Sequence, residues 1–150
     1  MVNAFKSSGT TLGEEVAMLL SLEMLQAIDR LHSCQIIHAD VKPDNFLFCG
    51  PLPDPASLRA ELSAAGTSTR RPFGEKTTPT TSTSRHSLVK LIDFGRCIDM
   101  TLFREGTNFF AKVKTDGYQC QEMVEGKPWT YQIDLFGLLA SIFVLLRVSG

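Results

Sequence analysis

Polar side chains that suit the handling of phosphate and metal ions lie in two short segments of the sequence. The first, His-Ala-Asp-Val-Lys-Pro-Asp-Asn at residues 38–45, brings Asp40, Lys42 and Asn45 into one loop. The second is Asp-Phe-Gly at residues 93–95, directly after an apolar run. Phosphoryl transfer needs a base beside the attacking hydroxyl, oxygen ligands for Mg²⁺ and a cation beside the moving phosphate. The two segments together carry that set of groups.

Each of these side chains fits one of those needs. Asp40 would accept or orient the proton of the substrate hydroxyl, and Lys42 would steady the transferred phosphate. The side-chain oxygen of Asn45 and the carboxylate of Asp93 would ligate Mg²⁺, which prefers oxygen ligands. The glycine two residues after Asp93 lets the backbone turn sharply and direct the acid at the metal. The sequence therefore predicts ATP and Mg²⁺ as cofactors, bound in part by Asn45 and Asp93.

The elements that must position these residues are visible in the hydrophobic pattern. Short apolar runs at residues 35–37, 46–48 and 88–92 predict strand-like pieces on either side of the two polar segments. A helix is predicted from about residue 14 to Ser33, because apolar residues recur there at helical spacing: Val16, Leu19, Leu20, Met24, Ala27, Ile28 and Leu31.

A final helix is predicted from about Tyr131 to Leu146. It is apolar nearly all round, which is typical of a fully buried helix. Its uncharged stretch is too short to span a bilayer. Trp129, just before it, is expected in the core, whereas His32 and His86 are expected at the surface.

Residues 50–87 differ in composition, because Ser, Thr and Pro crowd this stretch. Asp54-Pro55 favours the start of one short helix through Leu62. The remainder reads as a disordered insertion. It is either a passive spacer or a phosphorylation or docking segment, with Thr78-Pro79 as a candidate proline-directed site.

Size, charge and cysteine content limit the classes of protein to which this sequence can belong. The 150 residues suffice for one modest domain, so residues 1–150 are taken as one unit that contains the insertion. The formal net charge of −1 gives no general attraction to nucleic acid or to an anionic membrane. The four cysteines form no Cys-x-x-Cys pair and no zinc-ligand pattern, so they are expected to be reduced thiols.

At this point the sequence resembles the eukaryotic protein kinase family. Thr115, Tyr118 and Glu122 stand where these kinases have Gly-Thr-x-x-Tyr-x-Ala-Pro-Glu, although Cys-Gln replaces Ala-Pro before Glu122. The resemblance implies that Thr115 bonds to Asp40 and Lys42 and that Glu122 ends the activation segment.

Asp134 and Gly137 also match the family pattern. Asp134 with Gly137 matches the family's Asp-x-Trp-x-x-Gly at the start of a buried helix, with Phe136 in place of Trp. The resemblance implies that Asp134 bonds to the backbone of the catalytic loop. His38 is expected to pack and to bond backbone beside Asp93 rather than to carry protons.

Within the family the sequence is most similar to the Bub-type mitotic checkpoint serine/threonine kinases. The similarity covers about residues 88–140 closely, including Lys-Pro-Trp-Thr-Tyr-Gln-Ile-Asp-Leu-Phe-Gly at 127–137, and residues 15–49 well. It implies a nuclear and kinetochore kinase, also cytoplasmic, that phosphorylates chromatin and checkpoint proteins and binds kinetochore scaffold and checkpoint proteins. It implies neither direct nucleic-acid binding nor membrane attachment.

Departures from the family pattern limit what the resemblance implies. Ala39 stands where regulated kinases have the Arg that pairs with an activation-loop phosphate, so no such phosphorylation should be needed. The sequence shows no Gly-rich loop and no strand lysine of the Val-Ala-Ile-Lys type. We therefore expect a mainly α fold, namely the partial C-terminal lobe of an α+β parent kinase, with short β pairs around the catalytic loop.

Three function classes remain open at this stage. The first is a protein kinase whose 150-residue piece is inactive alone, and the second is a catalytically dead interaction module. The third, a small-molecule phosphotransferase, shares residues 38–45 but should lack the protein-substrate segment from Thr115 to Glu122.

Overall fold

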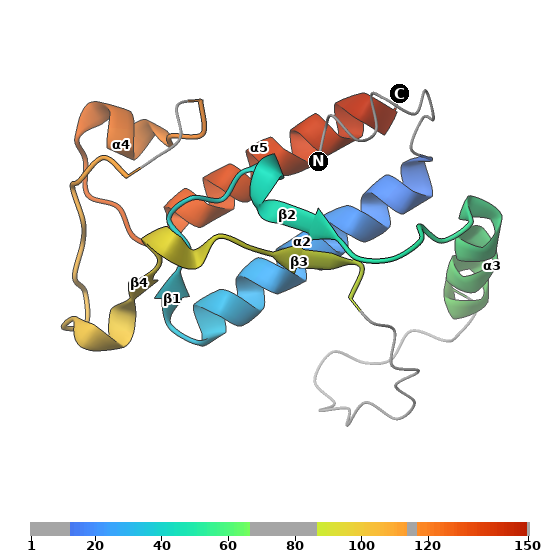
Figure 1. Cartoon of the computed structure of the whole chain (residues 1–150), viewed down its shortest axis with the longest axis horizontal. Coiled ribbons are helices and arrows are strands. Elements are labelled where there is room, and N and C mark those ends of the chain that lie inside the picture. Colours follow the sequence, from blue (N-terminus) through green and yellow to red (C-terminus); the bar gives the residue numbers. More distant parts are fainter. Residues whose placement is uncertain (1–12, 67–86, 114–116, 150) are drawn as a thin grey trace.

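Two long antiparallel helices form the frame of the molecule, and four short strands lie across them (Figure 1). The computed structural model describes residues 13–66, 87–113 and 117–149. Helix α2 spans Glu14–Ser33 and helix α5 spans Gln132–Ser149, and the two pack against each other. The expected mainly helical fold with short strand pairs is confirmed.

Helix α2 forms where the sequence predicts it, because its apolar residues share one face. Glu14 and Glu15 in its first turn and Arg30 and His32 in its last turn have the charges that the helix dipole favours. The face turned to the core is fully buried: Val16, Ala17, Leu20, Met24 and Ile28.

Two antiparallel strand pairs bring the two polar segments together. Strand β1 (Ile36–Ile37) pairs with β4 (Ile98–Asp99), and β2 (Phe46–Phe48) pairs with β3 (Val89–Leu91). The loop from β1 to β2 therefore starts and ends beside the segment from β3 to β4. The first contains the 3₁₀ helix η1 (Pro43–Asn45) and the second contains η2 (Phe94–Arg96). A further 3₁₀ helix, η3 (Met100–Leu102), follows β4.

Two apolar clusters support this arrangement. One joins α2 and α5 to the strands through Val41, Phe46, Val89 and Leu138, among others. The second lies under the short helix α4 (Gln121–Glu125) and contains Ile37, Ala39, Cys120, Met123, Trp129 and Ile133. Trp129 is fully buried, as expected, and its indole N–H donates to the Ala111 carbonyl at 3.0 Å.

Helix α5 is buried on one side only. An apolar face is exposed, and it consists of Leu135, Phe136, Leu139, Phe143 and Leu146. The helix is apolar on every side, and among the described residues it packs mainly against α2 and η1. Among those residues, no helix is long and apolar enough to cross a membrane.

The insertion is structured in its first part. Helix α3 spans Pro55–Gly66 and packs on the start of α2, where Leu58 is buried in the core and Arg59 forms an ion pair with Glu15. The carboxylate of Asp54 accepts a hydrogen bond from the Ser57 amide at 2.9 Å. The predicted helix is confirmed and ends later than expected. Residues 67–86, with Thr78-Pro79 and His86, lie outside the described residues.

Gly137 is the point at which α5 approaches the polar loop most closely. A Cβ atom at this position would lie 2.3 Å from the Val41 carbonyl oxygen. We predict that Gly137→Ala lowers the free energy of unfolding by about 2–3 kcal/mol, measured by chemical denaturation. Helix propensity alone would favour Ala by about 1 kcal/mol, which Ala140→Gly measures in the same helix. A neutral or stabilising Gly137→Ala substitution would contradict this close approach.

Candidate active site

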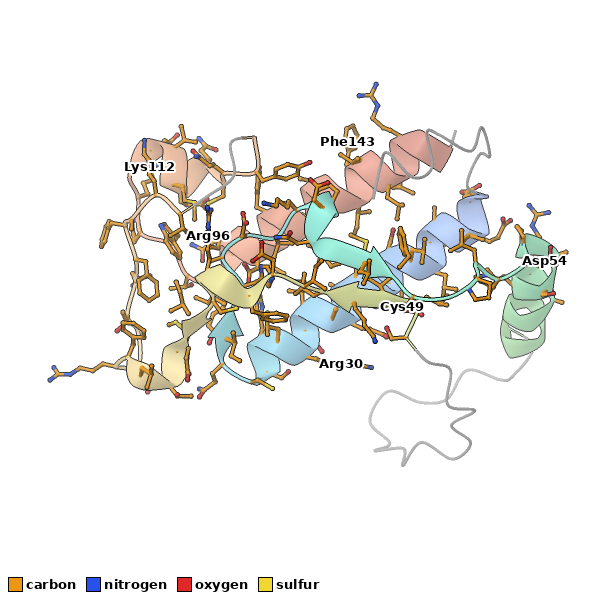
Figure 2. The ribbon with its side chains drawn as sticks, in the orientation of Figure 1. Arg30, Cys49, Asp54, Arg96, Lys112 and Phe143 are labelled. Carbon is orange, nitrogen blue, oxygen red and sulfur yellow. The ribbon has the colours of Figure 1, made fainter. Side chains whose placement is uncertain are left out.

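Asp40 lies at the centre of the candidate site and is flanked by two cations. Its side chain is largely buried, and the residue is 8% exposed. One carboxylate oxygen is 3.0 Å from Lys42 Nζ, and the other is 3.8 Å from Arg96 Nη1. Arg96 belongs to η2, and Figure 2 labels it in the left part of the view, below Lys112. Sequence analysis missed Arg96, because the strand pairing that brings it to Asp40 is not visible in the residues around it.

The backbone of the loop is held by Asp134 from the first turn of α5. One carboxylate oxygen accepts the His38 amide at 2.7 Å, and the other accepts the Ala39 amide at 2.9 Å. Ala39 has φ of +62°, a left-handed conformation that costs a non-glycine residue about 1–2 kcal/mol. Two short hydrogen bonds to a buried carboxylate keep the backbone in that conformation.

His38 joins the loop to the Asp-Phe-Gly segment. Its Nδ1 accepts the Asp40 amide at 3.3 Å, so the proton of the neutral ring is on Nε2, which donates to the Ile92 carbonyl at 3.0 Å. The ring also contacts Phe94 edge to face, with 5.2 Å between centroids. His38 thus has the supporting position expected of it, with both nitrogens bonded to backbone.

Asn45 and Asp93 carry oxygen donors of the kind that Mg²⁺ prefers. Asn45 is 4% exposed, and its Nδ2 donates to the Asp40 carbonyl at 2.8 Å, which leaves its amide oxygen as the atom suited to a cation. The Asn45 carbonyl accepts the Ile92 amide at 2.9 Å, so the residue before Asp93 is bonded directly to Asn45. Asp93 is exposed and has φ of +65°. An amide oxygen and a carboxylate, with substrate phosphates, form a donor set that suits Mg²⁺.

The remaining predicted residues lie at the edge of the site or outside the described residues. Thr115 falls within residues 114–116, which the structure does not describe. Glu122 lies in α4, and hydrogen bonds from its own backbone and from Cys120 hold the pKa of its carboxyl below the ordinary value. Met123, next to Glu122, lines a small hollow beside Asp40 together with Tyr118.

Cys97 and Tyr118 are two neutral side chains near the aspartates of the candidate site. Burial, and after it the charges of Asp134 and Asp93, raises the pKa of the Cys97 thiol. Burial, and after it the charge of Asp44, raises the pKa of Tyr118. Both side chains therefore remain protonated near neutral pH and add no charge to the site.

His32 is a supporting residue that sequence analysis placed at the surface, and the structure corrects this. His32 is only partly exposed, and its Nε2 lies 2.9 Å from Asp134 Oδ2, the oxygen that also accepts the His38 amide. The ring packs on Tyr131, with 4.8 Å between centroids. A histidine in the last turn of an amphipathic helix is common, so its local sequence did not distinguish it from a solvent-exposed residue.

The loop, the Asp-Phe-Gly segment and the buried aspartate at the start of α5 form the arrangement of a protein kinase C-terminal lobe. A model of the protein kinase domain matches residues 2–148. The chain belongs to the protein kinase family.

Its relatives place it near the Bub-type kinases, as the sequence motifs indicated. The mitotic checkpoint serine/threonine-protein kinase BUB1 of Mus musculus is 35% identical over 147 residues, and that of Arabidopsis thaliana is 37% identical over 147 residues. These alignments cover 97% and 98% of this chain, which spans only 12% and 25% of the two relatives. A crystal structure of the BubR1 kinase domain superimposes with a TM-score of 0.64 and 36% identity, covering 93% of this chain and 34% of that one.

The contact between His32 and Asp134 gives a prediction about the loop. His32→Phe keeps an aromatic ring against Tyr131 but removes the nitrogen that Asp134 contacts. We expect it to lower the free energy of unfolding by about 1–3 kcal/mol, because a buried charged acceptor loses a donor. Amide exchange of His38 and Ala39, measured by NMR, should become faster.

Two further variants control for other effects. His32→Gln keeps a polar donor and should retain most of the slow exchange. Ser33→Ala removes an exposed hydroxyl that bonds to the Asp29 carbonyl at the same helix end, and it should leave both amides unchanged. Unchanged exchange of His38 and Ala39 in His32→Phe would refute the supporting role of His32.

Proposed function

We propose that a longer protein containing this chain transfers the γ-phosphoryl group of ATP to serine and threonine side chains of proteins in the mitotic spindle checkpoint. The observation that carries the proposal is the buried Asp40 carboxylate, paired with Lys42 and set in a loop that also presents Asn45. The names of the relatives support the pathway, since they are mitotic or spindle assembly checkpoint kinases.

The side chains of the loop divide the chemistry between them. Asp40 receives the proton of the substrate hydroxyl as the oxygen attacks phosphorus, and its fixed position supplies much of the rate gain. Lys42 lies 3.0 Å from the Asp40 carboxylate and steadies the transferred phosphate. Asn45 and Asp93 would hold Mg²⁺, which would supply positive charge to neutralise the phosphates. Thr115 bonds to Asp40 and Lys42 in this proposal, and Glu122 supports the same segment.

We infer the cellular setting from the resemblance of the sequence to mitotic checkpoint kinases. Chromatin and checkpoint proteins are the proposed substrates, and kinetochore scaffold and checkpoint proteins are the proposed partners. The proposed location is the nucleus and the kinetochore, with a cytoplasmic pool.

A second candidate is a catalytically dead interaction module made of these 150 residues alone. The exposed apolar face of α5 favours it, because such a face suits binding rather than solvent. The intact set of Asp40, Lys42, Asn45 and Asp93 favours the kinase for any longer product.

One substitution tests the catalytic assignment. In the longer protein, we expect Asp40→Asn to lower kcat for a protein substrate by about 10²–10⁴-fold, because the base is lost while its shape is kept. The rate is measured as Mg²⁺-dependent phosphate transfer from labelled ATP. Asp44→Asn, an exposed carboxylate of the same loop, should leave kcat unchanged.

The same assay separates the two candidates. The 150-residue chain alone should bind ATP weakly and transfer no phosphate. Transfer by the longer protein that does not depend on Asp40 would refute the catalytic proposal. Asp40-dependent transfer by the short chain would refute its role as a dead module.

Ala39 gives a prediction about regulation. Its methyl group is 5% exposed and packs in the apolar cluster with Ile37 and Met123, so it offers no cation to a phosphate. The hydroxyl of Thr107 donates to the Arg104 carbonyl at 2.7 Å, which is a structural use of that side chain. We therefore expect Thr107→Glu to change kcat of the longer protein by less than about twofold.

Thr107→Ala is the matched control, because it removes the same hydroxyl without adding charge. The two variants should have equal activity in the transfer assay. Activation by Thr107→Glu alone would show that the segment is regulated by phosphorylation.

A further inference from the structure

The insertion is tied to α2 at its second end as well as at α3. The tie is Glu23, whose Oε2 accepts the hydroxyl of Ser87 at 2.9 Å and the amide of Val89 at 3.0 Å. Ser87 is exposed, whereas Val89 is 3% exposed and belongs to the core. The same hydroxyl also lies 2.8 Å from the Val89 carbonyl oxygen, so that carbonyl and Glu23 Oε2 share its proton. One carboxylate oxygen thus links an accessible hydroxyl to the first residue of β3.

This contact lies at one end of the strand whose other end positions Asp93. Val89 pairs with Phe48 in the β2–β3 ladder, and the Leu88 carbonyl accepts the Cys49 amide at 2.8 Å. Strand β3 then runs through Leu91 to Ile92, the residue bonded to both Asn45 and His38. A change at Ser87 therefore acts on the strand that supports the metal-binding segment.

We propose that Ser87 is a phosphorylation site and that its phosphorylation releases the start of β3 from α2. A protein kinase supplies the phosphoryl group from ATP: the bond between Ser87 Oγ and the γ-phosphorus forms, the bond to the β,γ-bridging oxygen breaks, and ADP leaves. The hydroxyl proton passes to the base of that kinase. The proposed release of β3 is inferred from the contacts of Glu23 with Ser87 and Val89. Any effect of this release on phosphoryl transfer depends on the function proposed above.

The chemistry of the contact determines the direction of the effect. The ester oxygen carries no proton, so Ser87 Oγ can no longer donate to Glu23 or to the Val89 carbonyl. A phosphate also places about −1.5 to −2 charges beside a carboxylate, and like charges at this distance repel. Lys90 is the nearest cation along the strand, but strand alternation puts it on the face opposite to the buried Val89, away from the phosphate.

The test uses this chain with phosphoserine installed at position 87. Hydrogen exchange of the β2–β3 amides, measured by NMR, should become about tenfold faster than in the unmodified chain. Ser87→Ala removes the hydroxyl without adding charge, and its effect should be clearly smaller. In the Glu23→Gln background the phosphoserine effect should fall to about twofold or less, because the glutamine amide can donate to the phosphate.

The possible results divide cleanly. Exchange that is unchanged or slower with phosphoserine at position 87 would overturn the proposed release, as would an effect of equal size in the Glu23→Gln background. The protein can also be isolated from dividing cells of its source organism with phosphatases inhibited. If Ser87 carries no phosphate there, the assignment of the phosphorylation site is overturned. The exchange readout needs no catalytic activity, so failure of the proposed kinase function gives a separate result.

Discussion

The carboxylate of Asp134 is the interaction on which the candidate site depends. It is 1% exposed, and a carboxylate in that position would cost several kcal/mol without partners. It has three partners: the amides of His38 and Ala39, and the ring of His32. Charge-assisted hydrogen bonds of this kind each contribute about 1.5–3 kcal/mol, which offsets the burial and the left-handed backbone at Ala39.

The same interaction explains why helix and loop must approach so closely. Asp134 reaches the loop only if the first turn of α5 lies against it, and Gly137 stands where the helix backbone meets the Val41 carbonyl. The loop in turn positions the Asp-Phe-Gly segment, because the Ile92 amide donates to the Asn45 carbonyl and the Ile92 carbonyl accepts from His38. Asp93 is thus positioned by a chain of backbone contacts that starts in α5.

The sequence predicted those parts of the structure that depend on local patterns. The spacing of apolar residues predicted helix α2, and a short apolar run predicted strand β3. Asp54-Pro55 predicted the start of helix α3. The roles of His32 and Arg96 could not be read in this way. Each contacts a partner far away in the sequence: His32 contacts Asp134, and Arg96 contacts Asp40. The spacing of neighbouring residues does not predict such contacts.

Residues 50–87 connect β2 to β3, and the structure holds both ends of this segment on α2. Closing a longer loop costs only about 0.6 kcal/mol for each doubling of its length, so added residues are inexpensive if both ends stay fixed. Here α2 fixes both ends, since Leu58 and Arg59 hold the outgoing side and Glu23 holds the returning side at Val89. The returning end is held by Glu23, by the pairing of Val89 with Phe48 and by the hydrogen bond between Cys49 and Leu88, and it continues directly into the strand before Asp93.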